Sequence, residues 1–188
     1  MKASVYIAVT LDGYIARENG SLDWLPGAEG EIDISSEPDN TLDYEDFGYN
    51  KFMENIDVLV MGRNTYEFVL SSGQWPYENK KVIVLSRTLD RVSSIVPDTV
   101  KIRSGSPNEI YLELKSEGAK HLYVDGGKTI QRFLDSGLID ELVITTVPVL
   151  IGKGVPLFGV LNEDKKLKLL ESKHYSNGFV QNKYLVLD

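Results

Sequence analysis

The sequence contains no cysteine, which excludes disulfides, thiolate metal sites, iron–sulfur clusters and cysteine nucleophiles. Histidine is nearly as scarce. Only His121 and His174 occur, and neither lies near a patterned serine or a cluster of carboxylates. A hydrolytic triad and a histidine-rich metal site are therefore disfavoured, and we expect no metal.

The chain also lacks a long apolar run. Its longest apolar stretch, Leu142 to Gly152, includes two threonines and falls well below the roughly 18 residues that a membrane span needs. The amino terminus is apolar only briefly before it reaches Asp12, which is too short a run for a signal peptide. We therefore expect a cytoplasmic protein that has no membrane partner.

Positive charge is in deficit, because 20 Lys and Arg residues face 28 Asp and Glu residues, a net charge of −8. Such a surface repels phosphate backbones, so we expect no nucleic-acid partner. An anionic small ligand can bind only where a few cations and backbone N–H groups are focused locally. A length of 188 residues with 42% hydrophobic residues indicates one folded domain spanning residues 1–188.

Short apolar strands alternate with helical patterns along most of the chain. This order predicts a doubly wound α/β sheet, mostly parallel, with helices on both faces and a C-terminal antiparallel β-hairpin. The residues around Ser106 predict a helix most clearly, with Ser at the N-cap, Pro107 at the first helical position and Glu109 three residues after the cap. Strands are expected over 5–10, 57–61, 81–85, 99–103, 121–125 and 141–149, helices over 42–55, 64–70, 106–118 and 129–136, and the hairpin over 168–173 and 179–187.

Residues 16–41 have no periodicity and collect glycine, proline and acidic residues, including an acidic insertion at 27–40. A structureless stretch of this length in a small domain is often an active-site loop. A solvated insertion is the alternative.

Two strand-to-helix junctions combine glycine, a cation and free helix N–H donors. The first is residues 61–65, MGRNT, and the second is residues 125–129, DGGKT. Each suits a phosphate group, although glycine at such a turn can also be required only for packing. Two junctions in one sheet match the two ends of a dinucleotide. Arg87, which follows Ser86 at another strand end, suits the 2′-phosphate of NADPH or is a solvated surface residue.

Two common nucleotide motifs are absent. A triphosphate loop ending in Gly127-Lys128-Thr129 needs a further glycine where the chain has Leu122. No G-x-G-x-x-G pattern occurs anywhere in the sequence.

Four segments, in the correct order, resemble dihydrofolate reductases and the reductase domains of bacterial riboflavin biosynthesis (RibD C-terminal domains). They are VLVMGRNT from Val58, VIVLSR from Val82, YVDGGKTIQRFL from Tyr123 and DELVITTVPVLIGKGVPLF from Asp140. TLDGYIA, from Thr10, resembles the first strand and loop of the same superfamily. The resemblance implies a dihydrofolate reductase-like fold, in a stand-alone relative of the riboflavin-type domain.

The resemblance also implies NADPH as the cofactor. It assigns residues to three parts of the cofactor: Gly62, Arg63, Asn64, Thr65, Ser86 and Arg87 to the adenosine phosphates, Gly126, Gly127, Lys128 and Thr129 to the diphosphate, and Ala8 and Ile15 to the nicotinamide.

The substrate side of the site is implied in the same way. In dihydrofolate reductases an acid lies sixteen residues before the glycine of the Gly-Arg pair, a position that is Asp46 here. Asp46 is the candidate proton donor or water-orienting group, and Asp12, Asp43 and Glu45 are the alternatives after a small alignment shift. Candidates for contact with the substrate are Trp24, Phe47, Tyr49 and Asn50.

Two functions are consistent with these residues. The first is an NADPH-dependent reductase that transfers hydride to a C=N or C=O of a small pterin-like or pyrimidine-like heterocycle, similar to dihydrofolate reductase or to 5-amino-6-(5-phosphoribosylamino)uracil reductase. The second is a non-catalytic nucleotide-binding or regulatory module, favoured by Tyr6, which stands where the riboflavin reductases have lysine. The resemblance and the apolar segment Val147 to Phe158 also predict a homodimer.

Overall fold

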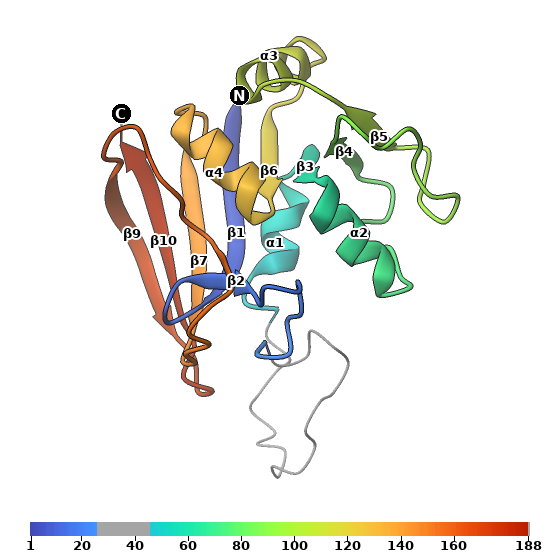
Figure 1. Cartoon of the computed structure of the whole chain (residues 1–188). Coiled ribbons are helices and arrows are strands. Elements are labelled where there is room, and N and C mark those ends of the chain that lie inside the picture. Colours follow the sequence, from blue (N-terminus) through green and yellow to red (C-terminus); the bar gives the residue numbers. More distant parts are fainter. Residues whose placement is uncertain (26–45, 188) are drawn as a thin grey trace.

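An eight-stranded sheet runs through the part of the chain that the computed structural model describes, residues 1–25 and 46–187 (Figure 1). Its strand order is β5-β4-β3-β6-β1-β7-β10-β9. Neighbouring strands from β5 to β7 are parallel, whereas β10 is antiparallel to both β7 and β9. The predicted sheet is therefore confirmed. The bounds are β1 (Lys2–Thr10), β3 (Val58–Gly62), β4 (Lys81–Leu85), β5 (Val100–Arg103), β6 (His121–Asp125), β7 (Glu141–Val147), β9 (Lys166–His174) and β10 (Val180–Leu187).

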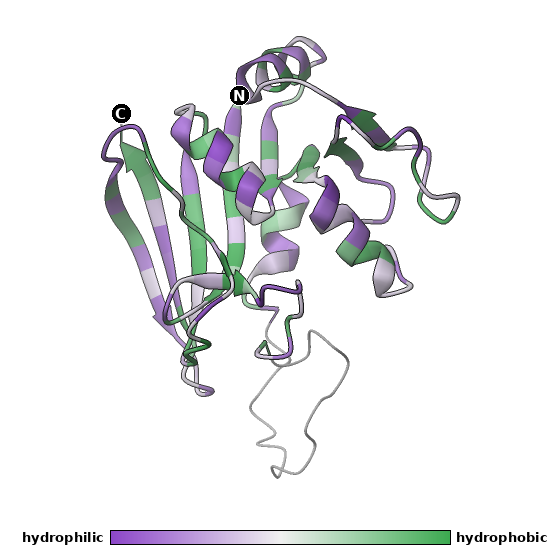
Figure 2. Cartoon of the chain, viewed as in Figure 1, coloured by the Kyte–Doolittle hydropathy of each residue, from purple (hydrophilic) through white to green (hydrophobic). Residues whose placement is uncertain are grey.

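Among the described residues, four helices cover the two faces of the sheet, because successive side chains of each buried strand point to opposite sides. Val58 and Val60 of β3 pack with α3 (Pro107–Ser116) and α4 (Gly127–Asp135) on one face. Leu59 and Met61 of the same strand pack with α1 (Tyr49–Glu54) and α2 (Arg63–Ser71) on the other face. The central strands are accordingly apolar along most of their length (Figure 2).

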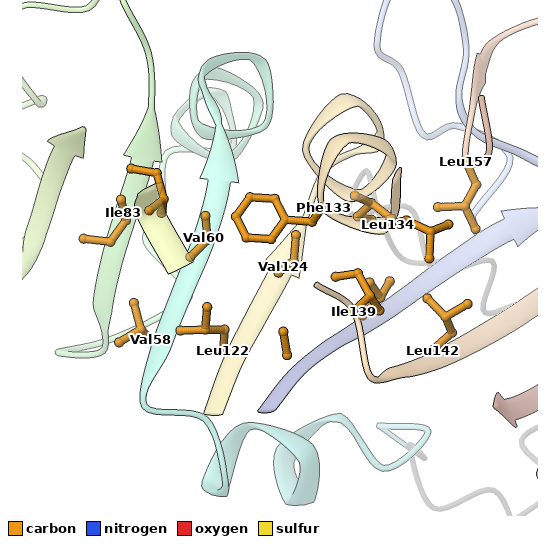
Figure 3. Packing of buried hydrophobic residues seen from close by; sticks show 14 of the residues in the cluster. Val58, Val60, Ile83, Leu122, Val124, Phe133, Leu134, Ile139, Leu142 and Leu157 are labelled. Atoms are coloured by element: carbon orange, nitrogen blue, oxygen red, sulfur yellow. The ribbon is translucent and has the colours of Figure 1, made fainter. Parts of the chain in front are cut away.

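The larger core cluster lies between the sheet and α4. Phe133 of α4 is fully buried and lies beside Val60 and Val124 (Figure 3). Leu134, one residue further on, packs in the same cluster with Leu142 of β7. This packing fixes α4 on the sheet, and with it the position of the helix amino terminus.

A separate two-stranded ribbon is formed by β2 (Tyr14–Ala16) and β8 (Val155–Pro156). It brings the segment after β1 against the segment after β7, although about 140 residues separate them in the sequence.

The helix predicted over 42–55 begins later than expected. Residues 42–45 lie outside the described residues, while Asp46, Phe47 and Gly48 form a turn and α1 starts at Tyr49. Phe47 and Gly48 have φ values of 50° and 86°, a left-handed conformation that a helix cannot continue through. Asp46 therefore precedes α1, which corrects the expectation of a helix through this position.

No helix among the described residues is long and apolar enough to cross a membrane.

The predicted start of α3 is confirmed in full. The Ser106 hydroxyl accepts a hydrogen bond from the Glu109 backbone N–H, and the Glu109 carboxylate accepts one from the Ser106 backbone N–H at 2.7 Å. This reciprocal pair satisfies two backbone donors that the helix itself leaves without partners.

We predict that Ser106→Ala lowers the free energy of unfolding by about 1 kcal/mol, because it removes the acceptor for the Glu109 N–H. Urea denaturation monitored by circular dichroism measures the change. Ser104→Ala, at an exposed position just before the helix, is the matched control and leaves the stability within about 0.5 kcal/mol.

Candidate cofactor and active site

The two glycine-containing junctions lie side by side at the carboxyl edge of the sheet. Met61 pairs with Asp125 across β3 and β6, so Gly62 and Gly126 follow at the same level. A Cβ added at Gly62 would lie 2.9 Å from the Thr129 hydroxyl oxygen. A Cβ at Gly126, whose φ is 87°, would overlap the Thr65 hydroxyl oxygen. Each glycine therefore makes room for the threonine of the other junction.

The two helices that begin there leave their amino termini available to a ligand. The N-caps of α2 and α4 are Gly62 and Gly126, and within the described chain neither terminus has a side-chain cap. First-turn N–H groups and the positive end of the helix dipole favour an anion at such a position. Lys128, in the first turn of α4, is exposed. This arrangement fits the diphosphate of a dinucleotide.

The cations expected at the adenosine end lie around one turn. Arg63 donates from Nη1 to the Thr88 hydroxyl at 2.9 Å and pairs through Nε with Glu67 at 2.7 Å. Arg87, one residue before Thr88, is exposed and has no ion pair among residues 1–25 and 46–187. The turn itself is held by the Ser86 hydroxyl, which accepts hydrogen bonds from the backbone N–H groups of Thr88 and Leu89. The guanidinium of Arg87 is thus available for a phosphate monoester.

The residues expected at the nicotinamide divide between two neighbouring places. Ile15 lies against α4, where its Cδ1 would be 3.0 Å from a Cβ added at Gly127. Ala8 lies in a small apolar cluster with two candidate substrate residues, Trp24 and Phe47. The structure therefore brings together Ala8, Trp24 and Phe47, while Ile15 packs against Gly127 at the start of α4.

A polar network holds the turn before α1. Tyr6, which replaces the expected lysine, donates its hydroxyl proton to the Phe47 carbonyl at 2.5 Å. Gln181 donates to the same carbonyl at 3.1 Å and also contacts the Tyr6 hydroxyl and Thr145. Burial raises the pKa of Tyr6 to about 12, so the phenol stays neutral. Tyr6 positions the turn instead of supplying a cation.

Asp46 also acts on this turn. Its two carboxylate oxygens accept hydrogen bonds from the backbone N–H groups of Gly48, at 2.9 Å, and Asn50, at 2.7 Å. These bonds cap the start of α1. Both oxygens of Asp46 therefore already have partners. A role for Asp46 in proton transfer stays a prediction.

Asp12 ties two loops together. Its carboxylate accepts hydrogen bonds from the Thr10 hydroxyl at 2.6 Å and from the backbone N–H groups of Ile151 and Gly152. The Thr10 hydroxyl and then the Gly152 and Ile151 N–H groups hold the pKa of this exposed carboxyl below its ordinary value. Such an environment favours the charged form and does not favour a proton donor.

A third acid, Asp125, has the opposite environment, and the sequence reasoning did not select it. Asp125 ends β6, directly before the glycine pair, on the same face of the sheet as α1. Loss of surrounding water raises the pKa of its carboxyl to about 6, against the opposing effect of a hydrogen bond from the Gly126 N–H at 2.8 Å. The sequence feature that could have identified Asp125 is its position at the carboxyl end of a buried strand.

A cleft lies between α1 and the turn that follows α2, on the face of the sheet that α1 covers. Its volume is about 290 Å³, and two candidate substrate residues, Tyr49 and Asn50, line it. The Asp125 carboxylate adds to the effect of burial in raising the pKa of Tyr49. The acid and the cleft therefore belong to one region of the molecule.

Known proteins share this architecture. The model of the RibD C-terminal domain family matches residues 2–181. The uncharacterized protein YwjB of Bacillus subtilis (strain 168) is 34% identical over 176 residues, which cover 93% of this chain and 92% of YwjB. The solved structure of a putative riboflavin biosynthesis protein from Shewanella sp. PV-4 is 41% identical, with full coverage of both chains and a TM-score of 0.86.

A more distant structure shares the fold alone. Dihydrofolate reductase from Enterococcus faecalis, solved with NADP(H), is 15% identical, covers 100% of this chain and 97% of its own, and has a TM-score of 0.66. The expected dihydrofolate reductase-like fold and the resemblance to the riboflavin-type reductase domain are both confirmed.

The raised pKa of Asp125 predicts a pH-dependent stability change in Asp125→Asn. Between an ordinary unfolded value near 4 and about 6, the folded carboxyl binds a proton that the unfolded chain has lost, so wild-type stability falls as pH rises through this window. The variant lacks this titration. Its gain in unfolding free energy over wild type should grow between pH 4 and pH 7, by at most about 3 kcal/mol.

Urea denaturation at pH 5 and pH 8 measures this gain. Asp164→Asn, an exposed change of the same kind, serves as the control and should show no such trend. A stability difference between Asp125→Asn and wild type that is the same at pH 5 and at pH 8 would contradict the assignment.

Proposed function

The chain belongs to the RibD C-terminal domain family, and on that premise we propose that it is an NADPH-dependent reductase. The hydride would pass to a C=N or C=O bond of a small heterocycle of the pterin or pyrimidine kind. One observation carries the proposal: two uncapped helix amino termini face the same edge of the sheet, held together by Gly62 and Gly126. The NADP(H) bound in the Enterococcus faecalis dihydrofolate reductase, which has the same fold, supports it.

In this proposal, the residues of the chain bind and orient the cofactor. Backbone N–H groups at Gly62 to Thr65 and Gly126 to Thr129 hold phosphates, with charge from Lys128. Arg87, next in sequence to the Thr88 that Arg63 contacts, recognises the 2′-phosphate that distinguishes NADPH from NADH. By the resemblance, Ala8 and Ile15 would contact the nicotinamide, which when bound would supply the hydride.

Reduction of C=N also requires a proton, and we assign its donation to Asp125. A carboxyl whose pKa is about 6 is partly protonated near neutral pH, which suits a general acid. Asp46 orients the start of α1, and through it Tyr49 at the wall of the cleft. Asp12 holds the loop after β1 to the loop at Ile151 and Gly152.

A non-catalytic nucleotide-binding module is the second candidate. Tyr6 favours it, because a neutral phenol at this position cannot supply the positive charge of the lysine found in the riboflavin reductases. A homodimer also stays a prediction. Leu150 and Phe158, in the apolar segment 147–158, are 69% and 44% exposed, while Val147 and Leu157 are buried.

Arg87 should select the cofactor. We predict that Arg87→Ala weakens NADPH binding by about tenfold or more and changes NADH binding less than about threefold, since a charge-assisted pair is worth about 1.5–3 kcal/mol. Fluorescence titration of both cofactors measures the two dissociation constants. Arg91→Ala, an exposed arginine nearby, should affect neither. Equal losses for NADPH and NADH would show that Arg87 only supports the turn.

Asp125 should control turnover. In a screen of pterins, pyrimidines and related carbonyl compounds, we expect NADPH oxidation with wild type, at a rate that falls as pH rises above about 6. Asp125→Asn should lower that rate by about 10²-fold or more and leave NADPH affinity unchanged. Asp46→Asn, compared in the same assay, should lose less. A pH-independent wild-type rate would argue against Asp125 as the acid, and no turnover with any compound would favour the non-catalytic module.

A further inference from the structure

Tyr123 lies two residues before Asp125 on β6, so both side chains point to the face of the sheet that α1 covers. Tyr123 is only 5% exposed, whereas Asp125, at the strand end, is partly exposed. A ligand can therefore reach the acid from outside the protein, while the phenol belongs to the core. The two side chains are neighbours with different access to solvent.

The phenol of Tyr123 leans along the strand toward the acid. Tyr123 pairs with Ser4 across β6 and β1, so Tyr6, two residues further along β1, lies at the level of Asp125. The Tyr123 hydroxyl nevertheless donates to the Tyr6 backbone carbonyl, at 2.9 Å. Its oxygen therefore lies near the level of Asp125, and the carboxylate is within hydrogen-bonding reach of it.

One hydroxyl proton thus faces two acceptors. A phenol has a single O–H to donate, and its oxygen can also accept. While Asp125 carries a proton, the acid is itself a donor, and the Tyr6 carbonyl binds the proton of Tyr123. Once Asp125 is ionised, its carboxylate is a stronger acceptor than a backbone carbonyl. Rotation about the C–O bond of the phenol is enough to change from one acceptor to the other.

The side chains around this pair are mostly neutral. The titratable side chains on the elements nearest to Asp125 are four phenols, those of Tyr6 of β1, Tyr49 of α1, Tyr77 of the turn after α2 and Tyr123 itself. Burial raises the pKa of all four, so they keep their protons. The nearby cations, Arg63 of α2 and Lys128 of α4, are exposed, and no ion pair within the described chain joins either of them to Asp125.

We propose that Tyr123 is a positioning residue for the proton of Asp125: when the acid gives up its proton, the Tyr123 hydroxyl turns from the Tyr6 carbonyl to the carboxylate. In the proposed reduction of C=N, the O–H bond of Asp125 breaks and its proton passes to nitrogen, while hydride is added to carbon. The carboxylate left behind accepts from the Gly126 N–H and from the Tyr123 hydroxyl. Tyr123 itself neither gains nor loses a proton. The catalytic part rests on the proposed function, whereas the exchange of hydrogen bonds is a property of the protein alone.

Tyr123→Phe should raise the pKa of Asp125, because the charged carboxyl loses a donor. In protein labelled with ¹³C-aspartate, the midpoint of the Asp125 Cγ titration should move up from about 6 by about half a pH unit or more. The resonance is assigned by its absence from Asp125→Asn. Replacement of Tyr123 by 3-fluorotyrosine, a stronger donor of nearly the same shape, should move the midpoint down. Tyr184→Phe removes a hydroxyl from the other face of the sheet and should leave the midpoint unchanged.

The pH–rate profile gives a second measurement. With a compound that wild type reduces, Tyr123→Phe should move the alkaline limb upward together with the titration midpoint and lower the maximal rate by about tenfold, since the ionised acid is less stabilised. A residue that only supports the fold would lower the rate without moving the midpoint.

The proposal is overturned if Tyr123→Phe leaves the midpoint within about 0.2 pH unit of wild type, if 3-fluorotyrosine at this position fails to lower it, or if Tyr184→Phe moves it equally. The titration requires neither cofactor nor substrate. Shifted midpoints without NADPH oxidation by wild type would therefore confirm the exchange of hydrogen bonds and count against the proposed reductase function.

Discussion

The site depends on the close approach of two strand-to-helix junctions. Gly62 leaves space for Thr129, and Gly126 leaves space for Thr65, so the amino termini of α2 and α4 can begin at the same level of the sheet. Any larger residue at Gly126 would meet both a threonine and a φ of 87°. The burial of Phe133 and its neighbours then fixes α4, and thereby the donors at its amino terminus, on the sheet.

Three acids near this edge differ in role because their partners differ. The carboxylates of Asp12 and Asp46 accept backbone N–H groups and hold loops in place. Asp125 has one such bond and little surrounding water, so its pKa is raised to about 6. A perturbed acid beside a cleft is a candidate functional group on physical grounds. The structure thus favours Asp125, which the sequence predicted only as the end of a strand, over the acids that the sequence selected.

Local signals predicted most of the fold, and tertiary contacts explain the rest. The strands at 81–85 and 121–125 match the structure residue for residue, and the Ser106 capping box is formed, because each depends on neighbours in the sequence. The start of α1 could not be found in this way. Phe47 adopts its left-handed conformation under the hold of Tyr6 and of Gln181, which is 134 residues away in the sequence. The pKa of Asp125 likewise depends on burial by distant elements, which spacing along the chain does not report.

The central claim is that two helix amino termini, side by side at one edge of the sheet, hold the phosphates of a dinucleotide. A ¹⁵N-labelled sample titrated with NADPH tests it most directly, because each backbone N–H reports its own contact. The largest shifts should fall on Gly62 to Thr65 and Gly126 to Thr129, with smaller ones at Ser86 and Arg87. Saturable shifts that leave both glycine junctions unchanged would contradict the account.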